Sequence, residues 1–259
     1  MEKVISRDGV SIAYERSGAG PALALVHGAV SDHTRWAPIL PELEKRFTVF
    51  AMDRRGRGES GDSPDYSLER EIDDVVAVVE SIGEPVSLLG HSLGGFFALE
   101  AALAAPHLRK LVLDEPDVEG ASGFWEQGLA DAHALFDVGD KENALVMFLL
   151  EVAKLTPGEV EFMRRLPSWP ARVAAAHTVI REVEGLLAYR SDLSRFPRLD
   201  VPTLLLLGGS SAPECKMFVE LLAAALPTNR VAVIPGQGHI AMLTAPDLWL
   251  AEVIGFLAD

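Results

Sequence analysis

The feature that most constrains the fold is a stretch in which an apolar run, a glycine-flanked turn and an alanine-rich segment follow one another. Residues 86–89 are largely apolar, the next five residues read Gly-His-Ser-Leu-Gly, and residues 96–105 have the composition of a helix. This order predicts a strand, a sharp turn and a helix, the setting of the G-x-S-x-G motif. A turn this tight strains the backbone at Ser92, which is tolerated only if Gly90 and Gly94 carry no Cβ atom.

The serine at the centre of this turn is a candidate nucleophile. The turn presents the Oγ atom of Ser92 above the carboxyl end of the strand, at the N-terminus of the following helix. The free N–H groups and the partial positive charge found there favour a developing oxyanion. A serine that only caps a helix is the structural alternative, and the flanking strand and helix favour the nucleophile.

Strands and helices alternate along most of the chain. Two short strands at residues 4–6 and 11–16 predict an antiparallel hairpin, and apolar runs then alternate with amphipathic segments such as residues 68–82. This alternation predicts an α/β fold with a mainly parallel sheet that helices cover on both faces. In such sheets, ligands bind beyond the carboxyl ends of the strands.

The alternation stops between residues 117 and 197, where apolar residues recur at helical spacing. A structureless loop of this length inside a compact domain would be unusual, so we expect an insertion of three or four helices. The chain then divides into a core of residues 1–116 and 198–259 and an inserted segment of residues 117–197.

Composition limits the partners that the protein can have. The chain has 259 residues and a formal net charge of −15, which argues against binding to nucleic acid or to anionic membranes. Between residues 114 and 161 there are twelve acidic residues and two basic ones. A solvated acidic face explains this block, and repulsion of anionic substrates is a sharper hypothesis, so we expect an uncharged small-molecule substrate. The sequence is also compatible with a homo-oligomer.

The sequence predicts neither a disulfide nor a bound cofactor. Cys215 is the only cysteine, so no intrachain disulfide can form, and we expect it to pack rather than to bind a metal. No histidine pair has the spacing of a metal site, and the glycines of residues 53–60 do not match a nucleotide fingerprint. The N-terminus lacks the apolar core of a signal peptide, and we expect a cytoplasmic protein.

Four motifs give the chain a resemblance to the α/β-hydrolase superfamily, and they occur in the order typical of that family. They are His27-Gly28 after the third strand, Asp53-x-Arg55-Gly56-x-Gly58-x-Ser60 after the fourth, Gly90-His91-Ser92-Leu93-Gly94 after the fifth, and Gly236-x-Gly238-His239 after the last. The resemblance implies an α/β-hydrolase fold with an eight-stranded, mainly parallel sheet. It also implies that the insertion after the sixth strand is a helical cap over the site.

The resemblance implies a role for several further residues. A serine hydroxyl needs an adjacent base, and the family's order of nucleophile, acid and histidine implies His239. The backbone N–H groups of Leu93, which follows the nucleophile, and of Ala29 would form the oxyanion hole. His27 is then expected to brace its loop, and His91 to pack or to form a hydrogen bond.

The acidic member of the triad is where the sequence departs from the common pattern. Family members usually carry an aspartate in the turn after the seventh strand, but residues 208–213 contain no carboxylate. Some members place the acid after the sixth strand instead, which implies Glu115. Asp114 and Glu214 remain alternatives, and so does the absence of any acid.

These residues together predict a serine hydrolase that cleaves a small or medium carboxylic ester, a lactone or a thioester through an acyl-enzyme on Ser92. Carbon–carbon bond hydrolysis and perhydrolysis are alternatives within the family, and hydroxynitrile lyases keep the serine and histidine as a base system. A small-molecule receptor with a vestigial triad is an alternative of another class.

Overall fold

A computed structural model describes residues 1–105, 107–117, 126–189 and 192–258, without the side chains of residues 126–129. Its eight strands are β1 (Glu2–Ile5), β2 (Ser11–Gly18), β3 (Ala22–Val26), β4 (Thr48–Met52), β5 (Val86–His91), β6 (Leu108–Asp114), β7 (Thr203–Gly208) and β8 (Asn229–Ile234). They form one sheet in the order β1-β2-β4-β3-β5-β6-β7-β8. The pairs β1–β2 and β2–β4 are antiparallel and all others are parallel, which confirms the predicted mainly parallel sheet.

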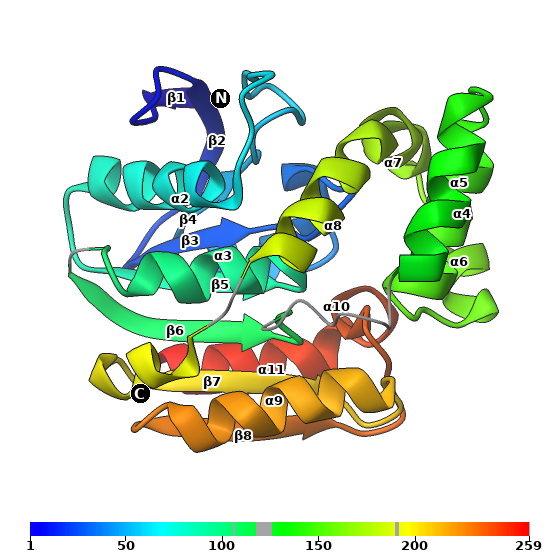
Figure 1. Cartoon of the computed structure of the whole chain (residues 1–259). Coiled ribbons are helices and arrows are strands. Elements are labelled where there is room, and N and C mark those ends of the chain that lie inside the picture. Colours follow the sequence, from blue (N-terminus) through cyan, green and yellow to red (C-terminus); the bar gives the residue numbers. More distant parts are fainter. Residues whose placement is uncertain (106, 118–125, 190–191, 259) are drawn as a thin grey trace.

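Helices pack against both faces of this sheet, and in Figure 1 α9 lies in front of it and α11 behind it. The helices are α1 (Leu40–Glu44), α2 (Leu68–Ile82), α3 (Leu93–Ala102), α4 (Glu126–Asp137), α5 (Lys141–Met147), α6 (Pro157–Arg164), α7 (Trp169–Ala175), α8 (Val179–Ala188), α9 (Pro213–Ala225), α10 (Ala241–Thr244) and α11 (Pro246–Ala258). Shorter helical segments are η1 (His33–Trp36), η2 (Phe148–Val152), η3 (Ala176–Thr178) and η4 (Leu193–Arg198). Among the described residues, no helix is long and apolar enough to cross a membrane.

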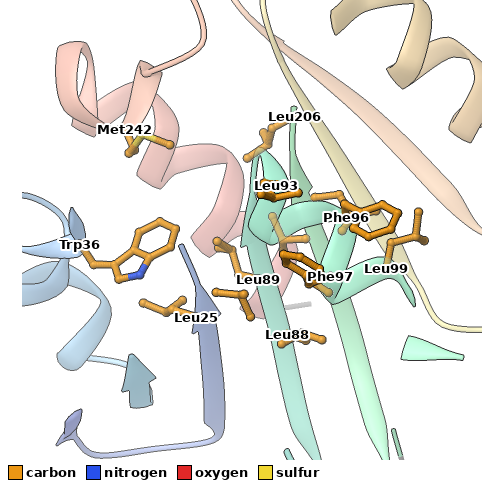
Figure 2. Packing of buried hydrophobic residues seen from close by; sticks show 14 of the residues in the cluster. Leu25, Trp36, Leu88, Leu89, Leu93, Phe96, Phe97, Leu99, Leu206 and Met242 are labelled. Carbon is orange, nitrogen blue, oxygen red and sulfur yellow. The ribbon is translucent and has the colours of Figure 1, made fainter. Parts of the chain in front are cut away.

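The central strands and α3 form the middle of the core. All residues of β3, β5 and α3 are buried, as expected for strands covered on both faces and for a helix enclosed by its neighbours. Figure 2 shows Phe96 and Phe97 of α3 next to β5, the strand that carries Leu88 and Leu89. This packing fixes the turn between β5 and α3, where Ser92 lies.

The described residues between β6 and β7 form helices and no strand. Of the segment 117–197 that we expect to be the inserted unit, residues 118–125 and 190–191 lie outside the described part. In Figure 1, helices α4 to α7 gather beyond the end of the sheet toward which the arrow of β6 points. That end carries the carboxyl ends of the parallel strands, where a ligand site is expected.

Candidate active site

Ser92 lies in the tight turn between β5 and α3. Its backbone has a φ of 54° and a ψ of −128°, a conformation that few residues other than glycine adopt. A Cβ atom at Gly90 would clash with the Gly94 carbonyl, and one at Gly94 would clash with the carbonyl groups of Val26 and His27. Glycine is therefore required at both positions, and the strained serine is held by its surroundings.

His239 is hydrogen-bonded to Glu115, which follows the end of β6. The Nδ1 atom of His239 lies 2.7 Å from the Oε2 atom of Glu115. The other carboxylate oxygen of Glu115 accepts a hydrogen bond from the backbone N–H of Gly208 at 2.6 Å and one from the hydroxyl of Ser211. Glu115 has a φ of 44°, so this position too is strained.

The turn after β7 thus has a function that the sequence did not reveal. The resemblance led us to expect a carboxylate in this turn, whereas its Gly208 and Ser211 donate hydrogen bonds to a carboxylate that comes from the end of the neighbouring strand. A hydroxyl in a turn that lacks its expected carboxylate is the signal that could have identified Ser211.

The two alternative carboxylates lie elsewhere. Asp114, at the end of β6, accepts a hydrogen bond from the indole Nε1 of Trp249 at 2.8 Å, and none of the described hydrogen bonds joins it to His239. Glu214 lies in the first turn of α9 and lines the cavity, but in the described part of the chain no hydrogen bond or ion pair joins it to His239. The alternation of side chains along the end of β6 separates Asp114 from Glu115 as expected.

The pKa values of Glu115 and His239 are shifted in opposite directions, because each group stabilises the charged form of the other. Burial raises the pKa of Glu115, but the hydrogen bonds and charge of His239, together with the Ser211 and Gly208 donors, leave it below its usual value. Burial lowers the pKa of His239, but its contacts with Cys215 and Glu115 raise it well above its usual value. Burial and the adjacent Glu115 raise the pKa of Asp114 to about 7.

Ser92 and His239 line one cavity, together with Ala29 and Leu93. Its other lining residues are Asp117, Phe148, Val152, Ala153, Lys154, Glu182, Val183, Leu186, Glu214, Cys215 and Phe218. No hydrogen bond joins Ser92 to His239 in the described structure; such contacts often tighten only when substrate binds. Leu93 is the first residue of α3, so its N–H has no partner within the helix and is available to a ligand.

The loop after β3 is braced by His27, as expected. Its Nε2 atom accepts a hydrogen bond from the backbone N–H of Arg54 at 3.1 Å, so its Nδ1–H donates to the carbonyl of Gly28 at 2.8 Å. Burial, followed by the charge of Arg54, lowers the pKa of His27 well below its usual value, so the ring is neutral. His27 thereby fixes the backbone just before Ala29.

His91 supports the position of His239. The two rings lie 4.8 Å apart between centroids, and the Nε2 of His91 lies 2.8 Å from the backbone carbonyl of His239. A carbonyl oxygen only accepts, so this Nε2 carries the hydrogen. Burial and the charge of Arg35 lower the pKa of His91 well below its usual value, which keeps the ring neutral.

Cys215 lies at the candidate site, a position that the sequence did not indicate. Its Sγ atom, a ring nitrogen of His239 and a carboxylate oxygen of Glu115 lie within 4.8 Å of one another, a grouping that could hold a metal ion. Around tetrahedral zinc, two such ligand atoms would be about 3.3 Å apart. The 2.7 Å between His239 and Glu115 fits a direct hydrogen bond instead.

The arginines of the loop after β4 join the sheet to the helices between β6 and β7. Arg54 forms buried ion pairs with Glu71 of α2 and with Glu182 of α8, and Arg57 also pairs with Glu182. Arg55 pairs with Asp74 of α2 at 2.7 Å. This loop therefore has a structural function.

Comparison with known proteins agrees with this fold. The profile of the alpha/beta hydrolase family matches residues 23–253. A pimeloyl-[acyl-carrier protein] methyl ester esterase from Aeromonas hydrophila is 28% identical over 96% of this chain and 100% of its own. A 2-(acetamidomethylene)succinate hydrolase from Mesorhizobium japonicum is 25% identical over 96% of this chain and 92% of its own.

A solved structure is similar over the whole chain. The crystal structure of an alpha/beta hydrolase from Sphaerobacter thermophilus superimposes with a TM-score of 0.86 and 32% identity, covering 99% of this chain and 100% of that one. The family profile, the named relatives and the sheet order agree on the class of protein and on its general activity. The chain belongs to the alpha/beta hydrolase family and is a hydrolase.

Proposed function

We propose that the protein is a serine hydrolase that cleaves a small or medium carboxylic ester, a lactone or a thioester through an acyl-enzyme on Ser92. The observation that carries this proposal is the hydrogen bond between His239 Nδ1 and the buried carboxylate of Glu115, at a cavity that Ser92 also lines. A nucleophile, a base and an acid that orients the base are the three groups that acyl transfer requires.

In the first half of the reaction, Ser92 Oγ attacks the carbonyl carbon of the ester and His239 Nε2 takes the hydroxyl proton. The N–H groups of Ala29 and Leu93 donate to the oxyanion that forms. The intermediate collapses when His239 returns the proton to the departing alkoxide. Glu115 holds Nδ1–H in place and stabilises the imidazolium that forms in between.

In the second half, water replaces the alcohol in the cavity. His239 removes a proton from this water as its oxygen attacks the acyl carbon, and the same proton then returns to Ser92 Oγ. The products are the carboxylic acid and a regenerated enzyme, so the cycle consumes one water for each ester cleaved.

The helices between β6 and β7 would serve as the cap. Phe148, Val183 and Leu186 of this segment line the cavity, and their apolar side chains suit the hydrocarbon part of an acyl or alcohol group. Of the two named relatives, one is a methyl ester esterase and the other a 2-(acetamidomethylene)succinate hydrolase. We take the ester as the reaction, because resonance from the nitrogen stabilises an amide carbonyl and makes an ester carbonyl easier to attack.

The proposal is tested by turnover of p-nitrophenyl acetate and p-nitrophenyl butyrate. We expect measurable hydrolysis by the wild type and its loss in Ser92→Ala, with circular dichroism as the check that the variant is folded. Undiminished turnover in the variant would contradict the role of Ser92. Inactivity toward a broad panel of esters, combined with tight binding of a small molecule, would favour a receptor instead.

A further inference from the structure

Two buried arginines differ from the other buried ones because no carboxylate in the described part of the chain forms an ion pair with them. Arg35 of η1 and Arg172 of α7 have exposed fractions of 4% and 2%. The remaining buried arginines, Arg54, Arg55 and Arg57, each form an ion pair with a carboxylate. Within the described ranges neither Arg35 nor Arg172 forms an ion pair, and the Nε atom of each is buried with no hydrogen-bond partner.

Both guanidinium groups line a second cavity at the candidate site. Ala29, Ser92 and His239 line this cavity as well as the first one, so the two cavities adjoin at the candidate site. Most of its other walls are apolar: Val30, Phe148, Leu149, Leu155, Met163 and Ile240. The arginines are therefore the principal charged groups on this side of Ser92.

Arg35 has few hydrogen-bond partners. Its Nη2 atom lies 3.3 Å from Nε2 of His91. That nitrogen already donates its hydrogen to the carbonyl of His239 at 2.8 Å, so it cannot accept one from Arg35. The remaining contact is with the Sδ atom of Met242 at 3.5 Å, and a thioether is a weak acceptor.

Arg172 comes from the helices between β6 and β7 and reaches the loop after β3. Its Nη1 atom donates to the carbonyl of Val30 at 3.2 Å, and Val30 has a φ of 45°. This hydrogen bond uses one donor and does not neutralise the positive charge, because a carbonyl carries only a partial negative charge.

The two positive charges are unfavourable where they lie. Burial, followed by the charge of Arg172, lowers the pKa of Arg35 to about 9, although Asp114 acts in the opposite direction. Burial also lowers the pKa of Arg172 to about 10, and Asp32 partly offsets this. Both groups are protonated at neutral pH, and a buried charge is costly unless it is paired. A bound anion would supply the missing partner.

We propose that the second cavity binds a free carboxylate group of the substrate, so that the protein hydrolyses esters that carry a negative charge. This inference rests on the proposed function, because it names the class of ester that the Ser92 site takes. Arginine is well suited to bind a carboxylate, and two guanidiniums at one cavity can donate to both of its oxygens. The described walls offer no further arginine or lysine for the additional oxygens of a phosphate.

The net charge of −15 favours an uncharged substrate, but it acts from a distance. Exposed charges are screened over about 8 Å at physiological ionic strength, whereas Arg35 and Arg172 line the cavity itself. For recognition at the reacting atoms, the local pair outweighs the overall charge.

The first test compares each acid with its neutral amide at equal length. Monomethyl succinate, glutarate and adipate carry the carboxylate on the acyl side, and O-acetylglycolate carries it on the alcohol side. The matched substrates replace that carboxylate by a carboxamide, and ester cleavage is followed by proton release. In at least one pair, we expect kcat/KM to be roughly tenfold or more higher for the acid, because hydrogen bonds to charged groups are strong.

Variants of the two arginines show whether they cause this preference. We expect Arg172→Gln and Arg35→Met each to lower the acid-to-amide ratio about tenfold. Glutamine at 172 keeps an N–H that can donate to the Val30 carbonyl, and the ratio cancels any general loss of activity. Arg165→Gln, an exposed residue of the same segment, is the control and leaves the ratio unchanged. Equal rates for acid and amide in every pair, or unchanged ratios in both cavity variants, would overturn the proposal.

A second test needs no turnover. Thermal unfolding of the Ser92→Ala variant is followed with succinate, glutarate, adipate, their diamides and inorganic phosphate. We expect a dicarboxylate to raise the melting temperature, the diamides not to, and Arg172→Gln to reduce the effect. Failure of every carboxylate, or equal stabilisation by phosphate, would contradict the carboxylate site. Carboxylate binding without hydrolysis of any ester would support the site and contradict only the proposed function.

Discussion

Replacing Glu115 by glutamine removes one charge and changes the hydrogen bonding of His239. The amide oxygen of glutamine can still accept from Gly208 and Ser211, which hold the carboxylate now. The amide nitrogen then takes the place of the Glu115 Oε2 atom, which lies 2.7 Å from Nδ1 of His239 in the wild type. Because an NH2 group only donates, Nδ1 must become the acceptor and the ring proton moves to Nε2.

This tautomer is the wrong one for catalysis, because Nε2 has to accept the proton of Ser92. The corresponding Asp-to-Asn change in a serine protease triad costs about 10⁴ in kcat, or about 5.4 kcal/mol of transition-state stabilisation. We expect a loss of this order in Glu115→Gln with little change in fold, since the buried donors keep their acceptor.

The assay is the kcat/KM for p-nitrophenyl butyrate, with thermal unfolding as the check on folding. Asp114→Asn is the matched control: it also neutralises a buried carboxylate of β6 but keeps an oxygen for Trp249. We expect its activity to remain near that of the wild type. Near-full activity in Glu115→Gln, together with its loss in Asp114→Asn or Glu214→Gln, would refute the assignment of the acid.

Three further predictions concern pH and stability. His239 must be neutral to act as a base, and its pKa is raised. We therefore expect kcat/KM to rise with pH and to reach its plateau above the usual histidine pKa of about 6.5. A profile that is flat from acid to neutral pH would contradict this. Cys215→Ala removes one of the contacts that raise this pKa, so it should shift the same limb to lower pH, and an unmoved limb would show that Cys215 has no such effect. Glu182→Gln leaves two buried arginines without full charge compensation and should lower the free energy of unfolding in urea by about 3–5 kcal/mol. The control is Glu184→Gln, at an exposed position of the same helix, which should lower it by less than about 1 kcal/mol. Equal losses in the two variants would contradict the importance of the buried ion pairs.

The sheet, its direction and the position of Ser92 could be predicted because they depend on local patterns. Residues 68–82 were expected to form an amphipathic helix, and α2 has these limits. Its buried face nevertheless includes Glu71 and Asp74, which no apolar pattern would place inside. They are buried because Arg54 and Arg55, from the loop between β4 and this helix, pair with them.

The site was less predictable where it depends on contacts between distant segments. Motif order indicated His239, but only the structure separates Glu115 from Asp114 and Glu214 by their contacts. Arg35 and Arg172 carried no sequence signal, because an arginine in a pattern is normally exposed or paired. Arg35 and Arg172 are neither exposed nor ion-paired with any described residue, and only the structure, which brings η1 and α7 together at one cavity, reveals this.

The central claim, that Ser92 is the nucleophile, is tested most directly by covalent labelling. The protein is treated with diethyl p-nitrophenyl phosphate, its intact mass is measured, and the modified peptide is sequenced by tandem mass spectrometry. We predict a single diethylphosphoryl adduct on Ser92, with no adduct in Ser92→Ala. No adduct on the active wild type, or one that maps to another residue such as Cys215, would contradict the claim.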